Sequence, residues 1–246
     1  MTLSVQETIA QRKAQGHGTL VAYLPVGYPD LATSVEASIA VLNSGADILE
    51  LGVPYSDPVM DGTVIARATQ TALERGFKLR HVFPAVAEIV KATGKPVLVM
   101  TYWNPVVQYG VENFATDLKA AGGAGLITPD LIPDEAADWL EISERLELER
   151  VFLAAPSSSD SRLDVAGEQS KGFVYAVSTM GITGTRIDVD SAARGLVERI
   201  YAQGAEATCV GLGISTAEHV TDVVGFADGA IVGSALVRAL SEGGVG

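Results

Sequence analysis

The chain is poor in cysteine and in basic side chains. Cys209 is the one cysteine among 246 residues, so an internal disulfide and any multi-cysteine metal site are excluded. Cys209 lies in the apolar run 207–210, where a core thiol is favoured over a nucleophile. Seventeen basic against thirty acidic residues leave a formal charge of −13, which argues against a nucleic-acid-binding protein.

Long apolar runs are missing as well. No stretch reaches the roughly 18 consecutive apolar residues of a membrane span, and the amino terminus lacks the apolar core of a secretory signal. We therefore expect a cytoplasmic protein without a membrane or nucleic-acid partner. With 48% apolar and 19% charged residues the chain is too apolar for disorder, and no charge block marks a linker. A single domain over residues 1–246 is the expectation.

Short apolar runs alternate with amphipathic stretches along the whole chain. Each run is rich in Val, Ile, Leu or Ala and ends at Gly, Pro, Asp or Ser, which is typical of buried parallel strands. Eight strand–helix units favour a closed (β/α)8 TIM barrel over an open doubly wound sheet, whose Gly-rich first turn is absent here. The predicted strands are 19–26, 46–53, 96–102, 124–129, 150–156, 172–178, 207–213 and 229–234.

Amphipathic segments between these strands predict the helices of the barrel. In this fold the active site lies at the carboxyl ends of the strands, so the informative residues are the last of each strand and the first of each following loop. The predicted helices are 30–45, 63–75, 79–93, 111–121, 134–146, 162–169, 190–202, 216–224 and 235–240.

An acidic residue stands inside the second predicted strand. Glu50 interrupts the apolar run 46–53, where desolvation would raise its pKa and let it hold or deliver a proton near neutrality; a buried ion-paired glutamate is the alternative. In the stiff loop that follows, Asp57 is interpreted as a turn residue. Asp61 either caps the helix predicted from residue 63 or pairs with Glu50 to divide acid and base duties.

Glycine-rich turns mark the ends of the last three predicted strands. They lie at 181–186, 211–215 and 233–234. Ordinary turn glycines would explain any one of these segments, but they explain poorly why all three lie at the carboxyl ends of strands. Backbone N–H groups bind phosphate even in an acidic chain, so we expect a phosphate site at the carboxyl ends of the seventh and eighth strands. The loop 179–188 has the composition of a mobile lid, and its Arg186 either contacts phosphate or lies on the surface.

The loop after the second strand carries a specific motif. Residues 49–58, Leu-Glu-Leu-Gly-Val-Pro-Tyr-Ser-Asp-Pro, followed by Asp61 and Gly62, closely resemble the tryptophan synthase alpha chain family. The chain departs from commoner family residues at Tyr55, Met60, Thr63 and Leu212. Further segments similar to the family fall in order at 100–105, 129–131, 175, 181–184, 211–215 and 231–234.

The resemblance implies a lyase that cleaves indole-3-glycerol phosphate to indole and glyceraldehyde 3-phosphate by retro-aldol chemistry, in tryptophan biosynthesis. It implies that Glu50 handles the protons of the indole ring carbon and the side-chain hydroxyl, and that Asp61 stabilises charge on the ring nitrogen. It implies that Tyr175 lies near these acids and that Thr183, in the closing lid, organises the aspartate. It also implies phosphate contacts at Gly184, Gly213, Gly233 and Ser234, and an indole pocket of Tyr102, Ile127 and Leu212.

The same resemblance implies a partner. Family members assemble with a pyridoxal-phosphate-dependent beta chain into an αββα heterotetramer, and no metal or organic cofactor is expected in this chain. Two alternatives stay open: a free-standing lyase, and a weakly catalytic activator of the beta chain. Retention of Glu50, Asp61 and Thr183 argues against the second, and turnover with and without a beta chain tests the first.

Overall fold

Nine parallel strands form a single sheet that closes on itself. The structure, a computed structural model, describes residues 4–177, 186–211 and 213–245. The strands follow the order β5-β4-β3-β2-β1-β9-β8-β7-β6. The two end strands, β5 and β6, are consecutive parts of one segment separated by Phe152, so the predicted (β/α)8 barrel is confirmed. The strands are β1 Thr19–Pro25, β2 Ile48–Gly52, β3 Val97–Met100, β4 Gly125–Ile127, β5 Glu149–Val151, β6 Leu153–Ala154, β7 Val174–Val177, β8 Thr208–Gly211 and β9 Gly229–Val232.

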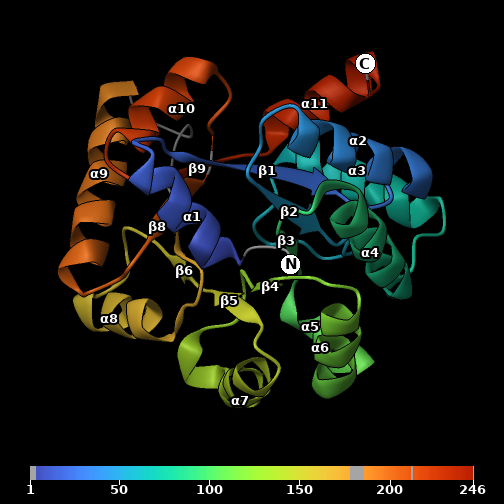
Figure 1. The fold of residues 1–246 in the computed structure, drawn as a ribbon, viewed down its shortest axis with the longest axis horizontal. Helices are drawn as coiled ribbons and strands as arrows, with labels where there is room; N and C mark the ends of the chain where they lie inside the picture. Colours follow the sequence, from blue (N-terminus) through green and yellow to red (C-terminus); the bar gives the residue numbers. More distant parts are fainter. Residues whose placement is uncertain (1–3, 178–185, 212, 246) are drawn as a thin grey trace.

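Helices surround this ring of strands (Figure 1). Among the described residues, no helix combines the length and the apolarity that crossing a bilayer requires. The helices are α2 Leu31–Asn43, α3 Thr63–Glu74, α4 Val82–Thr93, α5 Trp103–Tyr109, α6 Val111–Ala120, α7 Ala137–Arg145, α8 Asp160–Gln169, α9 Arg186–Ala202, α10 Ala217–Val224 and α11 Ser234–Gly243, with 3-10 turns at Leu79–His81 and Pro133–Glu135.

The predicted fifth strand, 150–156, is wrong in one respect, because it breaks where it changes neighbours. β5 pairs with β4, and β6 pairs with β7. Arg150 of β5 forms an antiparallel bridge with Lys171, and between the two strands the backbone N–H of Phe152 donates to the Ser170 hydroxyl at 3.3 Å. The predicted lid is also partly a helix: residues 186–188 belong to α9, while 179–185 lie outside the described residues.

Helix α1, Val5–Ala14, is not among the predicted helices and closes the amino-terminal end of the barrel. Ser4 and Glu7 form a reciprocal capping box at its start. The buried carboxylate of Glu149, the first residue of β5, accepts from the first two backbone N–H groups of the helix at 2.8 and 2.9 Å. Val5 and Ile9 pack on the apolar barrel interior, and Figure 1 shows α1 lying across the ring of strands.

The barrel interior changes from apolar to polar toward the carboxyl ends of the strands. Because alternate residues of a barrel strand point inward, Val21 and Ile48 are followed on the same inner face by Tyr23 and Glu50. Cys209 belongs to the apolar layer, as its core interpretation predicts. That layer also contains Leu98, Ile127, Val151, Phe173 and Ile231.

Candidate active site

Glu50 is the buried acid of the inner polar layer. It lies on β2 with 1% of its surface exposed, and its Oε2 atom has no hydrogen-bond partner among the described residues. Burial, and then the nearby negative charge of Asp61, raises the pKa of Glu50 to about 8. The neighbouring charge is therefore an acid and not a cation, which disfavours the ion-paired alternative. A carboxyl group that is neutral at pH 7 can donate a proton.

Asp61 lies at the end of the loop that leads from β2 to α3. The N-cap of α3 is Gly62, without a side-chain capping bond, so the helix-cap interpretation of Asp61 is wrong. Its Oδ1 atom instead accepts a hydrogen bond from the Tyr102 hydroxyl at 3.2 Å. Burial raises the pKa of Asp61, and the bond from Tyr102 opposes that rise. The loop thus directs a second, partly buried acid toward Glu50.

Tyr102 holds this loop through its hydroxyl group. The hydroxyl oxygen accepts from the backbone N–H of Met60 at 2.9 Å while the O–H reaches Asp61. Burial raises the pKa of Tyr102 to about 12, so the group stays a donor. Its ring lies 5.2 Å from the ring of Tyr55, whose hydroxyl accepts from Asn104 Nδ2 at 3.2 Å. Sequence reasoning considered the ring of Tyr102 for the indole pocket and missed the hydroxyl.

Two other predicted residues lie on β7 and β4. Tyr175 is on β7, and its hydroxyl occupies the space beside Gly211 of β8, 2.2 Å from where a Cβ atom of that glycine would be. Burial, and then the charge of Glu50, raises the pKa of Tyr175. Ile127, at the end of β4, is fully buried and belongs to the apolar layer of the barrel interior. Thr183, Gly184 and Leu212 lie outside the described residues.

Gly213, Gly233 and Ser234 follow the carboxyl ends of the paired strands β8 and β9. Helix α11 begins at Ser234, its N-cap is Gly233, and no side chain caps it. Gly213 has φ of 75°, a left-handed conformation that favours glycine. Uncapped N–H groups at a helix start bind anions, because they carry the positive end of the helix dipole. This geometry is what a phosphate site requires.

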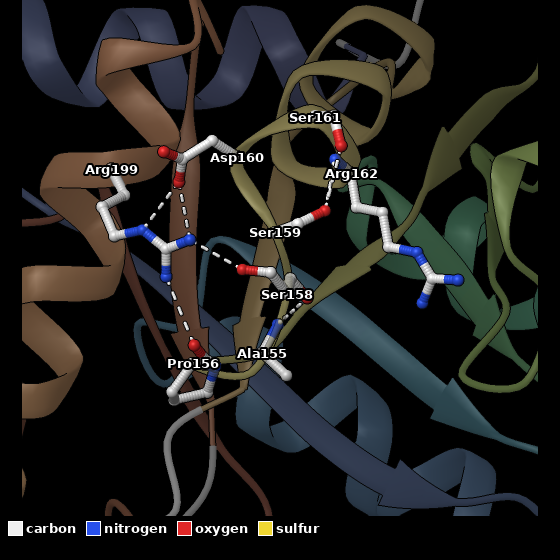
Figure 2. Close-up of polar contacts among 8 residues, drawn as sticks. All are labelled: Ala155, Pro156, Ser158, Ser159, Asp160, Ser161, Arg162 and Arg199. Carbon is white, nitrogen blue, oxygen red and sulfur yellow. Dashed lines mark hydrogen bonds and ion pairs between the residues drawn. The ribbon is translucent and has the colours of Figure 1, made fainter.

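A further loop at this end of the barrel is fixed by Arg199, which sequence reasoning missed. Figure 2 shows the guanidinium reaching from α9 to the loop that follows β6. It donates to the carbonyl oxygens of Pro156 and Ser158 at 3.2 and 2.6 Å, and to Oδ1 of Asp160 at 2.7 Å. The side chain of Arg162 points away from this cluster (Figure 2). Arg199 therefore orders the rim beside β7 and Tyr175.

The described residues contain no group of three or more His, Cys, Asp or Glu side chains that could hold a metal ion. A (β/α)8 barrel with two acids at the end of β2 and an uncapped helix start at the end of β9 defines an enzyme class, acid–base catalysts of phosphorylated substrates. The family model described as tryptophan synthase alpha chain matches residues 9–244. The chain belongs to this family, the lyase subunit that cleaves indole-3-glycerol phosphate in tryptophan biosynthesis.

Individual relatives agree with this assignment. A tryptophan synthase alpha chain from Leifsonia xyli subsp. xyli is 64% identical over 241 residues, which cover 98% of this chain and 92% of that one. A chain of aminoacrylate-bound tryptophan synthase from M. tuberculosis has a TM-score of 0.90 and 49% identity over 98% of this chain and 94% of that one. A chain of the tryptophan synthase α2β2 complex from Pyrococcus furiosus has a TM-score of 0.86 and 39% identity, over 93% of this chain and 92% of that one.

Proposed function

We propose that Glu50 is the acid–base catalyst of indole-3-glycerol phosphate cleavage in this chain. Its neutral carboxyl group protonates the indole ring carbon that bears the side chain. The resulting carboxylate takes the proton of the adjacent hydroxyl, a C=O bond forms, and the carbon–carbon bond breaks with its electron pair returning to the ring. The observation that carries this assignment is the burial of Glu50 beside Asp61, which raises the pKa of Glu50 to about 8.

Asp61 and its neighbours complete the proposed chemistry. An ionised Asp61 stabilises the positive charge that develops on the ring nitrogen once the ring carbon is protonated. Its hydrogen bond from Tyr102 supports the charged form. Tyr175 and, by resemblance, Thr183 support the two acids. The ring of Tyr102 together with Ile127 and Leu212 forms the proposed indole pocket.

The phosphate is proposed to bind at the uncapped start of α11. Gly233 and Ser234 supply backbone N–H groups there, and Gly213 approaches from the end of β8. Gly184 is assigned to the same site by resemblance. Because backbone N–H groups present partial positive charge, they can bind a phosphate even in a chain whose formal charge is −13.

We propose a beta chain as the partner, in an αββα assembly that carries pyridoxal phosphate in the beta chain and no cofactor in this one. Large apolar side chains are exposed in segments that follow β2, β3 and β4: Val59 is 78% exposed, Val107 49% and Ile132 40%. Because β2, β3 and β4 are adjacent in the sheet, these segments follow neighbouring strands, and exposed apolar groups that lie near one another are typical of a protein interface. Acting in amino-acid biosynthesis, the chain is proposed to be cytoplasmic.

Indole release by the purified chain, alone and with a beta chain, tests the proposal. Glu50→Gln and Asp61→Asn should each lower turnover about a hundredfold or more. Asp57→Asn is the matched control, since this exposed acid lies in the same loop and should keep turnover. Near-normal turnover of Glu50→Gln would overturn the acid–base assignment. Full activity without any gain from a beta chain would favour the free-standing lyase.

A further inference from the structure

Tyr23 lies beside Glu50 on the inner wall of the barrel. Strands β1 and β2 pair in parallel with Tyr23 opposite Glu50 in the register. Residues opposite one another on paired strands point to the same face, so both side chains point inward. Tyr23 is 6% exposed. Neither the motif nor the charge pattern of the sequence indicates this residue.

The ring of Tyr23 fills the space left by two glycines of the site. A Cβ atom on Gly52 would lie 2.4 Å from the Tyr23 hydroxyl oxygen, so the hydroxyl occupies the position that a side chain at residue 52 would take. A Cβ atom on Gly233 would lie 3.3 Å from the Cδ1 atom of the same ring. The side chain of Tyr23 therefore lies between the end of β2 and Gly233 of the proposed phosphate site. Its hydroxyl lies over β2 two residues beyond Glu50, on the same face of the strand.

The surroundings of Glu50 hold acids and phenols. Its Oε2 atom is buried without a hydrogen-bond partner among the described residues. Burial, and then Asp61 and Glu50, raises the pKa of Tyr23, so its hydroxyl keeps its proton at any working pH. The titratable groups that interact with Glu50 or Tyr23 in the described part of the chain are Asp61, Tyr102, Tyr175 and Cys209.

We propose that Tyr23 is a positioning residue whose hydroxyl donates a hydrogen bond to the Glu50 carboxylate after Glu50 has given up its proton. The inference rests on the proposed function, in which Glu50 alternates between a neutral acid and a buried anion. A buried carboxylate without donors is strongly destabilised. A neutral phenol at the mouth of the barrel lowers that cost and fixes the orientation of the carboxylate toward the substrate.

Tyr175 has the same relationship to its neighbouring strand. Its hydroxyl lies over Gly211 of β8, as that of Tyr23 lies over Gly52 of β2. Both tyrosines interact electrostatically with Glu50. Tyr23 on β1 and Tyr175 on β7 therefore bring phenol hydroxyls toward the barrel interior from two different strands. Phenylalanine at position 23 would fill the same volume but could not donate.

Titration of Glu50 in Tyr23→Phe tests this role directly. The carbonyl band of the protonated Glu50, identified in infrared difference spectra by its loss in Glu50→Gln, reports the titration without needing turnover. Removal of the donor destabilises the carboxylate, so the midpoint should rise by about one pH unit. The high-pH limb of kcat should move up with it, and kcat should fall about tenfold while KM changes little. The control is Tyr109→Phe, since the Tyr109 hydroxyl donates to Asp117 outside the barrel and should leave both readouts unchanged.

A second variant should shift the midpoint of the Glu50 titration in the opposite direction. 3-Fluorotyrosine placed at position 23 is a more acidic and stronger donor, so it should lower the Glu50 midpoint. An unchanged midpoint in both variants, or a rise in KM alone, would overturn the proposal. Failure of the wild-type chain to release indole would instead overturn the proposed function, because the infrared titration of Glu50 remains readable in an inactive protein.

Discussion

The Tyr102 hydroxyl lies between Asp61 and the backbone of the loop that carries Asp61. It donates to Oδ1 of Asp61 at 3.2 Å and accepts from the N–H of Met60 at 2.9 Å. One side chain that follows β3 thus fixes both the position and the ionisation of an acid in the loop after β2. Tyr102 and Asp61 are 41 residues apart in the sequence. No sequence pattern indicates a contact between residues at that separation.

Tyr102→Phe should separate these two effects of the hydroxyl from packing. The bond from Tyr102 lowers the pKa of Asp61, so its loss should raise that pKa and move the acidic limb of the rate profile to higher pH. We expect kcat to fall about tenfold. Tyr55→Phe is the control, because the stacked Tyr55 hydroxyl accepts only from Asn104 in the described part of the chain. Equal profiles for the two variants would contradict the role given to Tyr102.

Glu50 should make the folded chain less stable as the pH rises. Its pKa is raised from 4.5 to about 8, so between these pH values the folded chain holds a proton that the unfolded chain has released. Stability then falls with rising pH by about 1.4 kcal/mol for each pH unit in this window. Glu50→Gln removes this dependence, so it should be stabilised relative to the wild type at pH 8 and much less so at pH 5. Urea unfolding at both pH values measures the difference.

The exposed Glu36→Gln is the matched control for that measurement. It removes the same formal charge from the surface and should shift stability equally at both pH values. If Glu50→Gln followed the pattern of Glu36→Gln, the raised pKa of Glu50 would be wrong.

The barrel and the two acids could be predicted from the sequence because both leave local signals. Apolar runs mark the strands, and Glu50 is an acid inside such a run. Helix α1 had a signal too: Ser4 and Glu7 have capping-box spacing, but few apolar residues follow them. The break at Phe152 had none, since it depends on which neighbour each half of the strand pairs with.

Side-chain contacts across the barrel could not be predicted in the same way. The hydroxyl contact of Tyr102 and the loop contacts of Arg199 join groups that come from different elements. The place of Tyr23 depends on two glycines, Gly52 and Gly233, that come together only when the barrel closes. Sequence patterns report which face a residue prefers. They do not report which residue of a non-adjacent segment it meets.

Gly213 and Gly16 form a matched pair for testing the phosphate site. Their φ angles are 75° and 76°, so Gly213→Ala and Gly16→Ala should carry a similar backbone strain of about 1 kcal/mol. Gly16 follows α1 at the far end of the barrel, and a Cβ atom there meets nothing within 4 Å. We expect about a tenfold rise in KM for Gly213→Ala and none for Gly16→Ala, with similar losses of stability. Equal KM values would remove Gly213 from the phosphate site.

The exposed apolar side chains after β3 and β4 should determine association with a beta chain. Val107 and Ile132 are 49% and 40% exposed, and a charge at either position would be desolvated without a partner in an apolar interface. Val107→Asp and Ile132→Asp should each weaken beta-chain binding about tenfold or more, while indole release by the isolated chain stays unchanged. Ala10→Asp adds the same charge to an exposed position of α1, at the amino-terminal end of the barrel, and serves as the control. Calorimetric titration with a beta chain measures all three affinities. If Ala10→Asp weakened binding as much as Ile132→Asp, overall charge and not this apolar surface would govern the association.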